Sequence, residues 1–273
     1  MGTENNANLE ANVIQNLVQE PKSTIGIFEL PCGYLTPEGD LITEVKVREI
    51  TGVEEDMLAA RNIPGGKKIT QLLGNCLERL GPMTDKPMLI ARARDLLVGD
   101  RVFLMLAIRR VTLGDDFPFE KECPNGECKK KSLYTVSLAD LEIRKMADPK
   151  KRVYEGILPA SGKPVRWHCM SGKEEEVLAK VGATEALSTA IQVRLDMLGG
   201  GPPILPAIKA LSMKDREWLR EQFEAAEGGV DTKLELTCPE CGENFEDQLD
   251  VGQTGFFFPS RILKRSNKST SSS

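Results

Sequence analysis

The segment VKVREITGVEEDMLA, residues 45–59, reads as an alternating strand that runs into the start of a helix. A shift of 120 positions gives VRWHCMSGKEEEVLA, residues 165–179, with the same order of features. In both segments a Thr or Ser precedes Gly and has a Glu three residues later, which is the spacing of a capping box. Acidic residues in the first turn also suit the positive end of a helix dipole. The two segments predict two copies of one strand–helix unit.

A second pair of segments extends the repeat. Asp100-Arg101 opens an apolar helical stretch, and Cys123 follows the arginine by 22 residues. Asp215-Arg216 opens another, and Cys238 follows its arginine by the same 22 residues. We expect the aspartates to begin helices and the arginines to bridge to a neighbouring carboxylate or carbonyl. The sequence predicts an α+β fold in which a strand–helix–helix–zinc-knuckle unit is duplicated in tandem with pseudo-twofold symmetry.

This pattern divides the 273 residues into four regions. Residues 25–150 form the first half, and residues 151–260 form the second half. Residues 1–24 form an N-terminal arm with apolar residues at helical spacing, which is either a short helix packed on its own domain or a docking helix for a partner. Residues 261–273 are Ser-rich, and we expect a disordered tail. The candidate partner contacts in the arm are Leu9, Val13 and Leu17.

The composition excludes several classes of protein. Lys and Arg number 36 and Asp and Glu number 41, and this net charge of −5 argues against a general nucleic-acid binder. Seven cysteines in a chain of this length are too few for a disulfide scaffold. No segment reads as a signal peptide or has the roughly 20 apolar residues that span a bilayer. We therefore expect a reducing bacterial cytoplasm, where paired cysteines serve as metal ligands more often than as disulfides.

Each half ends in a cysteine pair: Cys123-Pro-Asn-Gly-Glu-Cys128 in the first and Cys238-Pro-Glu-Cys241 in the second. Four thiolates are the ligand count of a closed tetrahedral zinc site. An ordinary zinc ribbon separates its pairs by about 15–20 residues, whereas 110 positions separate Cys128 from Cys238. Two related halves that pack around an axis would bring the pairs together. We predict one structural Zn²⁺ per chain, with two separate redox dithiols or metal-free knuckles as the alternatives.

The remaining reactive residues do not form a catalytic set. We expect the single cysteines Cys32, Cys76 and Cys169 to fill the core as small apolar residues. The only histidine, His168, lies at the repeat position of Arg48 and is expected to point outward. No nucleophile, base and oxyanion site can be assembled from these residues. The sequence therefore predicts a protein that is not an enzyme.

Three consecutive aromatic residues, Phe256, Phe257 and Phe258, lie near the end of the second half. In a strand, alternate rings would be buried, and the stretch would close the second half. Alternatively, the three rings form an aromatic anchor for a protein partner. Both interpretations remain open from the sequence.

The order of the motifs resembles the T4-type bacteriophage baseplate hub and tail-assembly protein family of contractile tails. The resemblance covers roughly residues 25–260. The first motif is Leu30-Pro31-Cys32-Gly33, followed by a Val-rich strand and Glu-Glu-x-x-Leu. Asp-Arg-x-Phe-Leu at 100–104 and Ile108-Arg109 come next, then the two cysteine pairs and Phe-Phe-Phe-Pro at 256–259.

The resemblance implies a non-enzymatic, chaperone-like role in building the baseplate hub, through contacts with other hub and tail proteins. It implies a location in the host cytoplasm during assembly and in the virion tail baseplate, with possible oligomerisation. It carries over only the four paired cysteines, as metal ligands. The alternative function is a zinc-ribbon module that binds nucleic acid, supported by the lysines at 129–131 and by basic residues of the tail. The basic tail residues are Arg261, Lys264, Arg265 and Lys268.

Overall fold

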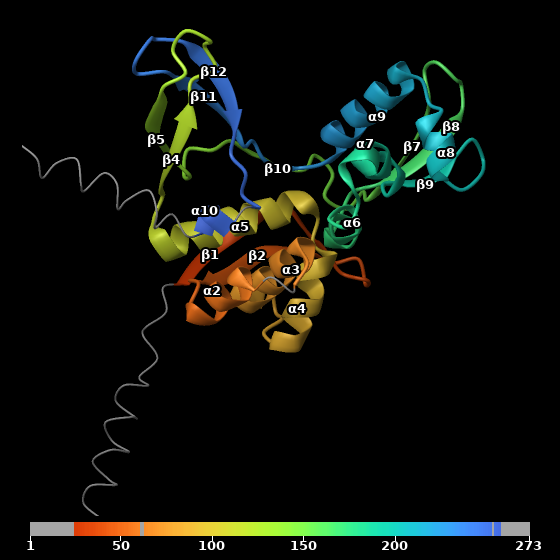
Figure 1. The fold of residues 1–273 in the computed structure, drawn as a ribbon. Coiled ribbons are helices and arrows are strands. Elements are labelled where there is room, and N and C mark those ends of the chain that lie inside the picture. The colour runs from red at the N-terminus through yellow and green to blue at the C-terminus, as the bar shows by residue number, and fades with distance from the viewer. Residues whose placement is uncertain (1–24, 61–62, 253, 258–273) are drawn as a thin grey trace, which may run out of the picture.

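The computed structural model describes residues 25–60, 63–252 and 254–257. Figure 1 shows three groups of elements, which we call the first lobe, the second lobe and the hairpin lobe. The fold is α+β, as the sequence predicts. The arm at 1–24, with its candidate contacts, and the tail at 261–273 lie outside the described residues.

The first lobe contains a three-stranded antiparallel sheet in the order β1-β2-β3. Its strands are Ile25–Leu35, Leu41–Arg48 and Leu77–Leu80. Its helices are α2 (Gly52–Ala59), α3 (Gly65–Cys76), α4 (Lys86–Asp95) and α5 (Val98–Leu113). The predicted alternation of the second strand is confirmed, because Val45 and Val47 are fully buried whereas Lys46 between them is not. These valines pack in one core with Leu72 and Leu104.

The second lobe repeats this arrangement of a sheet followed by helices. Its antiparallel sheet has the order β7-β8-β9, with strands Val153–Ile157, Pro164–His168 and Leu195–Leu198. Its helices are α6 (Gly172–Leu178), α7 (Ala183–Gln192), α8 (Leu205–Lys209) and α9 (Met213–Ala226). The core of this lobe gathers around Trp167 and Leu219.

The hairpin lobe combines one two-stranded hairpin from each half of the chain (Figure 1). The first is β4 (Asp116–Glu122) with β5 (Lys131–Ser137), and the second is β11 (Lys233–Thr237) with β12 (Asn244–Gln248). The short strands β6 (Ile143–Arg144) and β10 (Gly229–Val230) pair nearby. The chain described by the structure ends in α10 (Thr254–Phe257), a single turn that lies along α5 in the view of Figure 1.

The two sheets share an irregularity in their strand register. β2 pairs with β3 with a shift between Lys46 and Val47. β8 pairs with β9 with a shift between Arg166 and Trp167, which are 120 positions later. A bulge re-aims the following side chains, so a matched bulge gives both sheets the same relation to the next helix.

Both predicted capping boxes form. Glu54 Oε2 accepts hydrogen bonds from the N–H and hydroxyl of Thr51 at 3.0 and 2.8 Å. Glu174 Oε2 accepts the same two bonds from Ser171 at 2.8 and 2.6 Å. Each box satisfies an N–H group that the helix itself leaves without a partner.

The two aspartates lie in the first turns of α5 and α9, as expected, and each also accepts a hydrogen bond from a backbone N–H in or near the first strand of its lobe. Asp100 Oδ1 accepts a 2.7 Å hydrogen bond from the N–H of Cys32, which follows Leu30-Pro31. Asp215 Oδ1 accepts a 2.7 Å bond from the N–H of Ala160, which follows Leu158-Pro159. Both carboxylates are buried, so each hydrogen bond offsets part of the cost of removing the group from water.

The two arginines also make matching contacts. Arg101 Nη1 donates to the carbonyl of Ala93 at 2.6 Å, and Arg216 Nη1 donates to that of Ile208 at 3.1 Å, each eight residues earlier. Arg101 makes a further contact that crosses between the lobes: its Nε lies 2.7 Å from Glu175 Oε2 on α6. Its side chain is fully buried. The carboxylate and the carbonyl acceptor together offset the cost of burying a guanidinium at this depth.

The lobes meet where α6 packs on α3 and α4. Glu176 on α6 accepts a 2.8 Å hydrogen bond from Thr70 and lies 3.1 Å from Arg94 Nε. The contact is one-sided, since Gly172 on α6 is buried whereas Gly52, at the matching position of α2, is exposed. The pseudo-twofold expectation is therefore wrong for these helices, because a twofold axis would pair each contact with its reciprocal.

Within the residues that the structure describes, no helix has both the length and the apolar character needed to cross a bilayer.

We predict that Gly172→Ala destabilises the protein and that Gly52→Ala does not. An added Cβ at position 172 would lie 2.6 Å from Arg101 Nη1 and 2.9 Å from the carbonyl oxygen of Arg94. Such crowding costs about 1–3 kcal/mol. A Cβ at position 52 meets nothing within 4 Å, so its effect should stay within about 0.5 kcal/mol. Urea unfolding measures both, and equal effects of the two variants would contradict the one-sided contact.

We also predict a pH dependence from Asp100. Burial raises the pKa of its carboxyl from 3.8 to about 6, although the N–H of Cys32 and the charge of Arg152 oppose the rise. The folded chain thus binds this proton more tightly than the unfolded chain, so stability is lost as the pH rises from about 4 to about 6. Asp100→Asn cannot titrate, so the melting temperature of the wild type should fall relative to that of the variant across this range.

Asp215→Asn is the matched control for this pH series. The N–H groups of Ala160 and Ser161 outweigh burial and hold the pKa of Asp215 below its usual value. Stability from Asp215 is therefore lost only as the pH falls below about 4. If the difference in melting temperature between the wild type and Asp100→Asn stays constant from pH 4 to 7, the assigned titration of Asp100 is excluded.

Candidate metal centre

The four paired cysteines lie at the turns of the two hairpins, one pair from each half of the chain. The N–H of Cys123 donates to the carbonyl of Lys130 at 2.9 Å, and the N–H of Cys128 donates to that of Asn125 at 3.0 Å. In the second hairpin the N–H of Cys238 donates to the carbonyl of Glu243 at 2.8 Å. These backbone bonds fold each Cys-Pro segment into a turn that carries both of its sulfurs toward the other hairpin.

The four sulfurs form one compact cluster. All four Sγ atoms lie within 4.8 Å of one another. Cys123 and Cys241 are separated by 3.7 Å, and Cys128 and Cys238 by 3.9 Å. Sulfurs about 2.3 Å from a tetrahedral zinc ion lie about 3.8 Å from each other. The cluster therefore has the ligand number and spacing of a closed thiolate metal site.

The electrostatics of the cluster favour a cation. Burial acts against ionisation of Cys238, yet the N–H groups of Cys241 and Glu240 outweigh it and hold its pKa at about 7. The pKa of Cys123 is raised to about 12 by burial and by the neighbouring thiols. Like charges this close oppose one another, so the four groups cannot all ionise without a positive ion. A divalent metal would supply that charge.

Aromatic side chains pack between the two hairpins that carry the cluster. The rings of Tyr134 and Phe245 meet edge to face across the two hairpins at 6.1 Å, and Phe119 stacks on Tyr134 at 5.8 Å. Lys121 on β4 forms a 2.5 Å ion pair with Asp247 on β12. These contacts join the two hairpins. The sequence did not reveal them, because no local motif marks contacts between residues that are far apart in the sequence.

The lysines at 129–131 do not form an unpaired basic patch. Lys130 Nζ lies 2.6 Å from Glu240 Oε2 of the other hairpin, and Lys131 Nζ lies 4.0 Å from Glu122. In the described part of the chain these contacts neutralise much of the charge that a nucleic-acid backbone would need. The basic residues of the tail lie outside that part.

The aromatic residues near the chain end lie inside the molecule. Phe256 and Phe257 belong to a helical turn and not to a strand, and they are only 2% and 1% exposed. The ring of Phe117 lies 5.2 Å from that of Phe256, and Arg109 Nε donates to the Phe256 carbonyl at 3.1 Å. These two rings therefore pack α10 on the core of the first lobe. Phe258 lies outside the described residues.

The isolated cysteines occupy the predicted environment. Cys32, Cys76 and Cys169 are all buried. Burial raises the pKa of Cys76 to about 12 and that of Cys169 to about 11, so both remain neutral thiols.

His168 differs from the expectation of a simple outward position. Its Nδ1 lies 2.9 Å from Asp196, and its Nε2 lies 3.9 Å from the capping glutamate Glu174. Arg48 makes the matching contacts in the first lobe, to Glu54 and Glu78. Both side chains thus tie a strand end to the following capping box and to the third strand.

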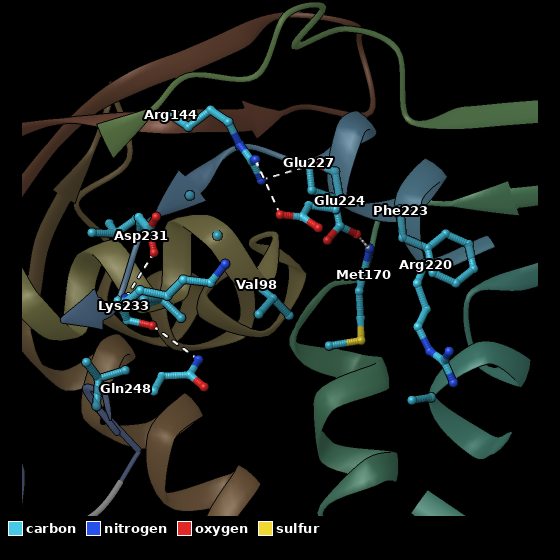
Figure 2. Close-up of a pocket in the computed structure, with 18 of the residues that line it drawn as sticks. Val98, Arg144, Met170, Arg220, Phe223, Glu224, Glu227, Asp231, Lys233 and Gln248 are labelled. Atoms are coloured by element: carbon cyan, nitrogen blue, oxygen red, sulfur yellow. Dashed lines mark hydrogen bonds and ion pairs between the residues drawn. The ribbon is translucent and has the colours of Figure 1, made fainter. Parts of the chain in front are cut away.

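A cavity of about 1020 Å³ lies where the three lobes approach one another, and Figure 2 shows its lining. Several of its polar groups are paired with each other. Arg144 Nη1 lies 3.8 Å from Glu224, and Glu227 Oε1 accepts a 2.8 Å hydrogen bond from the N–H of Met170 (Figure 2). Glu227 also lies 3.3 Å from Arg194. This lining joins the lobes and assembles no nucleophile with a base.

Sequence reasoning missed the acceptors of the buried arginine. Thr70, Glu175 and Glu176 come from segments far from Arg101 in the sequence, and they meet only because α6 packs on α3. The matched Asp-Arg pairs were the available signal, because a buried arginine draws its acceptors from whatever segments pack around it.

Comparison with known protein families gives a match. A family model described as T4 bacteriophage base plate protein matches residues 29–164. The match covers about half of the chain, including the first lobe and the first cysteine pair, and ends within β8. Comparisons with curated proteins and with solved structures give no match. The resemblance inferred from the motifs is confirmed over these residues, and the chain belongs to the T4-type bacteriophage baseplate protein family.

Proposed function

We propose that the chain is a non-enzymatic assembly protein of the baseplate hub in a contractile-tailed phage or phage-like particle, acting through contacts with other tail proteins. The family match carries this proposal. The paired polar groups of the cavity and the buried single cysteines support a structural role over catalysis. The protein would act in the host cytoplasm during assembly and in the tail baseplate of the particle.

We propose further that one zinc ion joins the two halves through Cys123, Cys128, Cys238 and Cys241. All four ligand positions are filled by thiolates, so the metal would contribute folding free energy and leave no open position for substrate. The sulfur spacing supports this assignment. Two separate redox dithiols fit less well, since each short contact joins a cysteine of one hairpin to a cysteine of the other.

We propose that the halves at 25–150 and 151–260 arose by tandem duplication. The support is the series of matched details: the register shift, the capping boxes, the aspartates that hold Cys32 and Ala160, and the arginines that reach back eight residues. Each detail uses a different kind of interaction. Their common order along the chain is what a duplicated unit would retain.

We predict about one zinc ion per purified chain. Cys238→Ser and Cys241→Ser should each lose the metal and lower the melting temperature, because three thiolates leave the site incomplete. Elemental analysis and thermal unfolding measure the two effects. Cys76→Ala is the control: it removes a buried thiol outside the cluster and should retain the metal. Two ions per chain, or no metal with an unchanged melting temperature, would refute the joint site.

We predict that the chain, co-expressed with the other tail proteins of its particle and affinity-captured, retains at least one of them. A variant with Cys128→Ser and Cys241→Ser separates metal-dependent contacts from the rest, because it removes one ligand from each hairpin. Retention of no tail protein by the wild-type chain would reject the assembly role.

A further inference from the structure

The contact between the lobes uses two distinct surfaces. The plug is the first turn of α6, where Gly172, Glu175 and Glu176 face the first lobe. The socket is the surface that receives it, formed by Gly66 and Thr70 of α3 with Arg101 of α5. An added Cβ at Gly66 would lie 3.1 Å from the backbone of Glu176, which shows how closely the helices approach.

The second lobe carries a counterpart of the socket that nothing in the described chain covers. Matching β3 with β9 places Thr184 at the position of Gly66 and Ser188 at that of Thr70. Gly66 and Thr70 are buried, whereas Thr184 is exposed and Ser188 is half-buried. Leu187, which shares this face of α7, is 70% exposed.

The arginine of this second socket lacks an acid. Arg216 is 8% exposed, and its guanidinium reaches the Ser188 hydroxyl at 3.3 Å and the Ile208 carbonyl at 3.1 Å. Within the described residues no carboxylate lies at ion-pair distance from it. Arg101 has the same two kinds of neighbour, and in addition Glu175 at 2.7 Å. A buried guanidinium gains most from a carboxylate, so the second socket is incomplete as it stands.

The first lobe carries the counterpart of the plug. The shift of 120 that relates the capping boxes places Gly52, Glu55 and Asp56 on α2 at the positions of Gly172, Glu175 and Glu176. All three are exposed on α2, and an added Cβ at Gly52 meets nothing within 4 Å. Each chain therefore presents a free plug on one lobe and a free socket on the other.

The sizes of the free plug and the free socket also match. Because Gly66 has no side chain, the longer side chain of Glu176 fits beside α3. In the second socket the glycine is replaced by Thr184, and in the free plug the glutamate is replaced by Asp56, which is one methylene shorter. The larger socket residue thus faces the smaller plug residue. Ser188, at the position of Thr70, would offer its hydroxyl to the Asp56 carboxylate, as Thr70 does to Glu176.

We propose that a second copy of this chain docks the start of its α2 on the α7 face of the first copy, with its Glu55 carboxylate on the Arg216 guanidinium. The contact joins two different surfaces, so it repeats head to tail and builds a ring or an open filament. The inference rests on the proposed equivalence of the two halves. It is independent of the zinc ion and of the identity of any tail partner.

The test is the mass of the full-length protein as a function of concentration, measured by sedimentation equilibrium. The wild type should increase in mean mass beyond that of one chain as the concentration rises. Glu55→Arg should abolish this increase by placing a cation opposite Arg216. Thr184→Arg should abolish it by filling the socket. Both positions are exposed, so both variants should keep the wild-type melting temperature.

Two surface changes in the hairpin lobe serve as matched controls. Thr135→Arg and Glu235→Arg alter exposed residues of the same types on β5 and β11 and should associate like the wild type. A mixture of Glu55→Arg and Thr184→Arg chains has one working plug and one working socket, so it should stop at a pair. A wild type that remains a single chain at all concentrations would overturn the proposal. Association retained in both socket and plug variants would also overturn it.

These outcomes are separate from those of the proposed function. Loss of the zinc ion or of tail-protein capture would leave the concentration dependence of the mass unaffected. Conversely, a chain that stays single could still bind metal and tail proteins. The two proposals therefore fail on different measurements.

Discussion

The structure depends on a buried guanidinium. Arg101 is fully enclosed at the start of α5, and its acceptors come from α3, α4 and α6. Glu175 supplies a carboxylate to this buried charge, and the ion pair places α6 of the second lobe against the first. Removing one partner of such a pair is far more costly than replacing the pair with apolar residues. The relative placement of the lobes is therefore specified by charge burial as well as by apolar packing.

Much of the local structure could be predicted from the sequence because its signals are local. Thr51 with Glu54, and Ser171 with Glu174, mark helix starts within four residues. The alternation of Val45 and Val47 marks a half-buried strand. The cysteine cluster could be predicted although its two pairs are far apart in the sequence. A structural zinc site takes four ligands, and the chain offers two cysteine pairs.

The parts that could not be predicted depend on tertiary contacts. The pseudo-twofold expectation was wrong for α2 and α6 because similar sequence segments do not determine whether two units meet reciprocally or head to tail. Phe256 and Phe257 form a buried helical turn because the Arg109 side chain and the Phe117 ring receive them, and neither is near them in sequence. The acidic first turn of α6 could not be distinguished from that of α2 until their neighbours were known.

The four-thiol cluster has a consequence for the order of events during synthesis. The first cysteine pair is complete at Cys128, which precedes Cys238 by 110 residues, and domains generally fold from the N-terminus as they are synthesised. The cluster is therefore complete only in a chain extended past Cys241. A chain that stops before Cys238 would carry the Cys123–Cys128 turn without the second cysteine pair, and it would lack Phe256 and Phe257, which pack in the first core. Metal capture at this position would thus distinguish finished chains from fragments before any of them enters a particle.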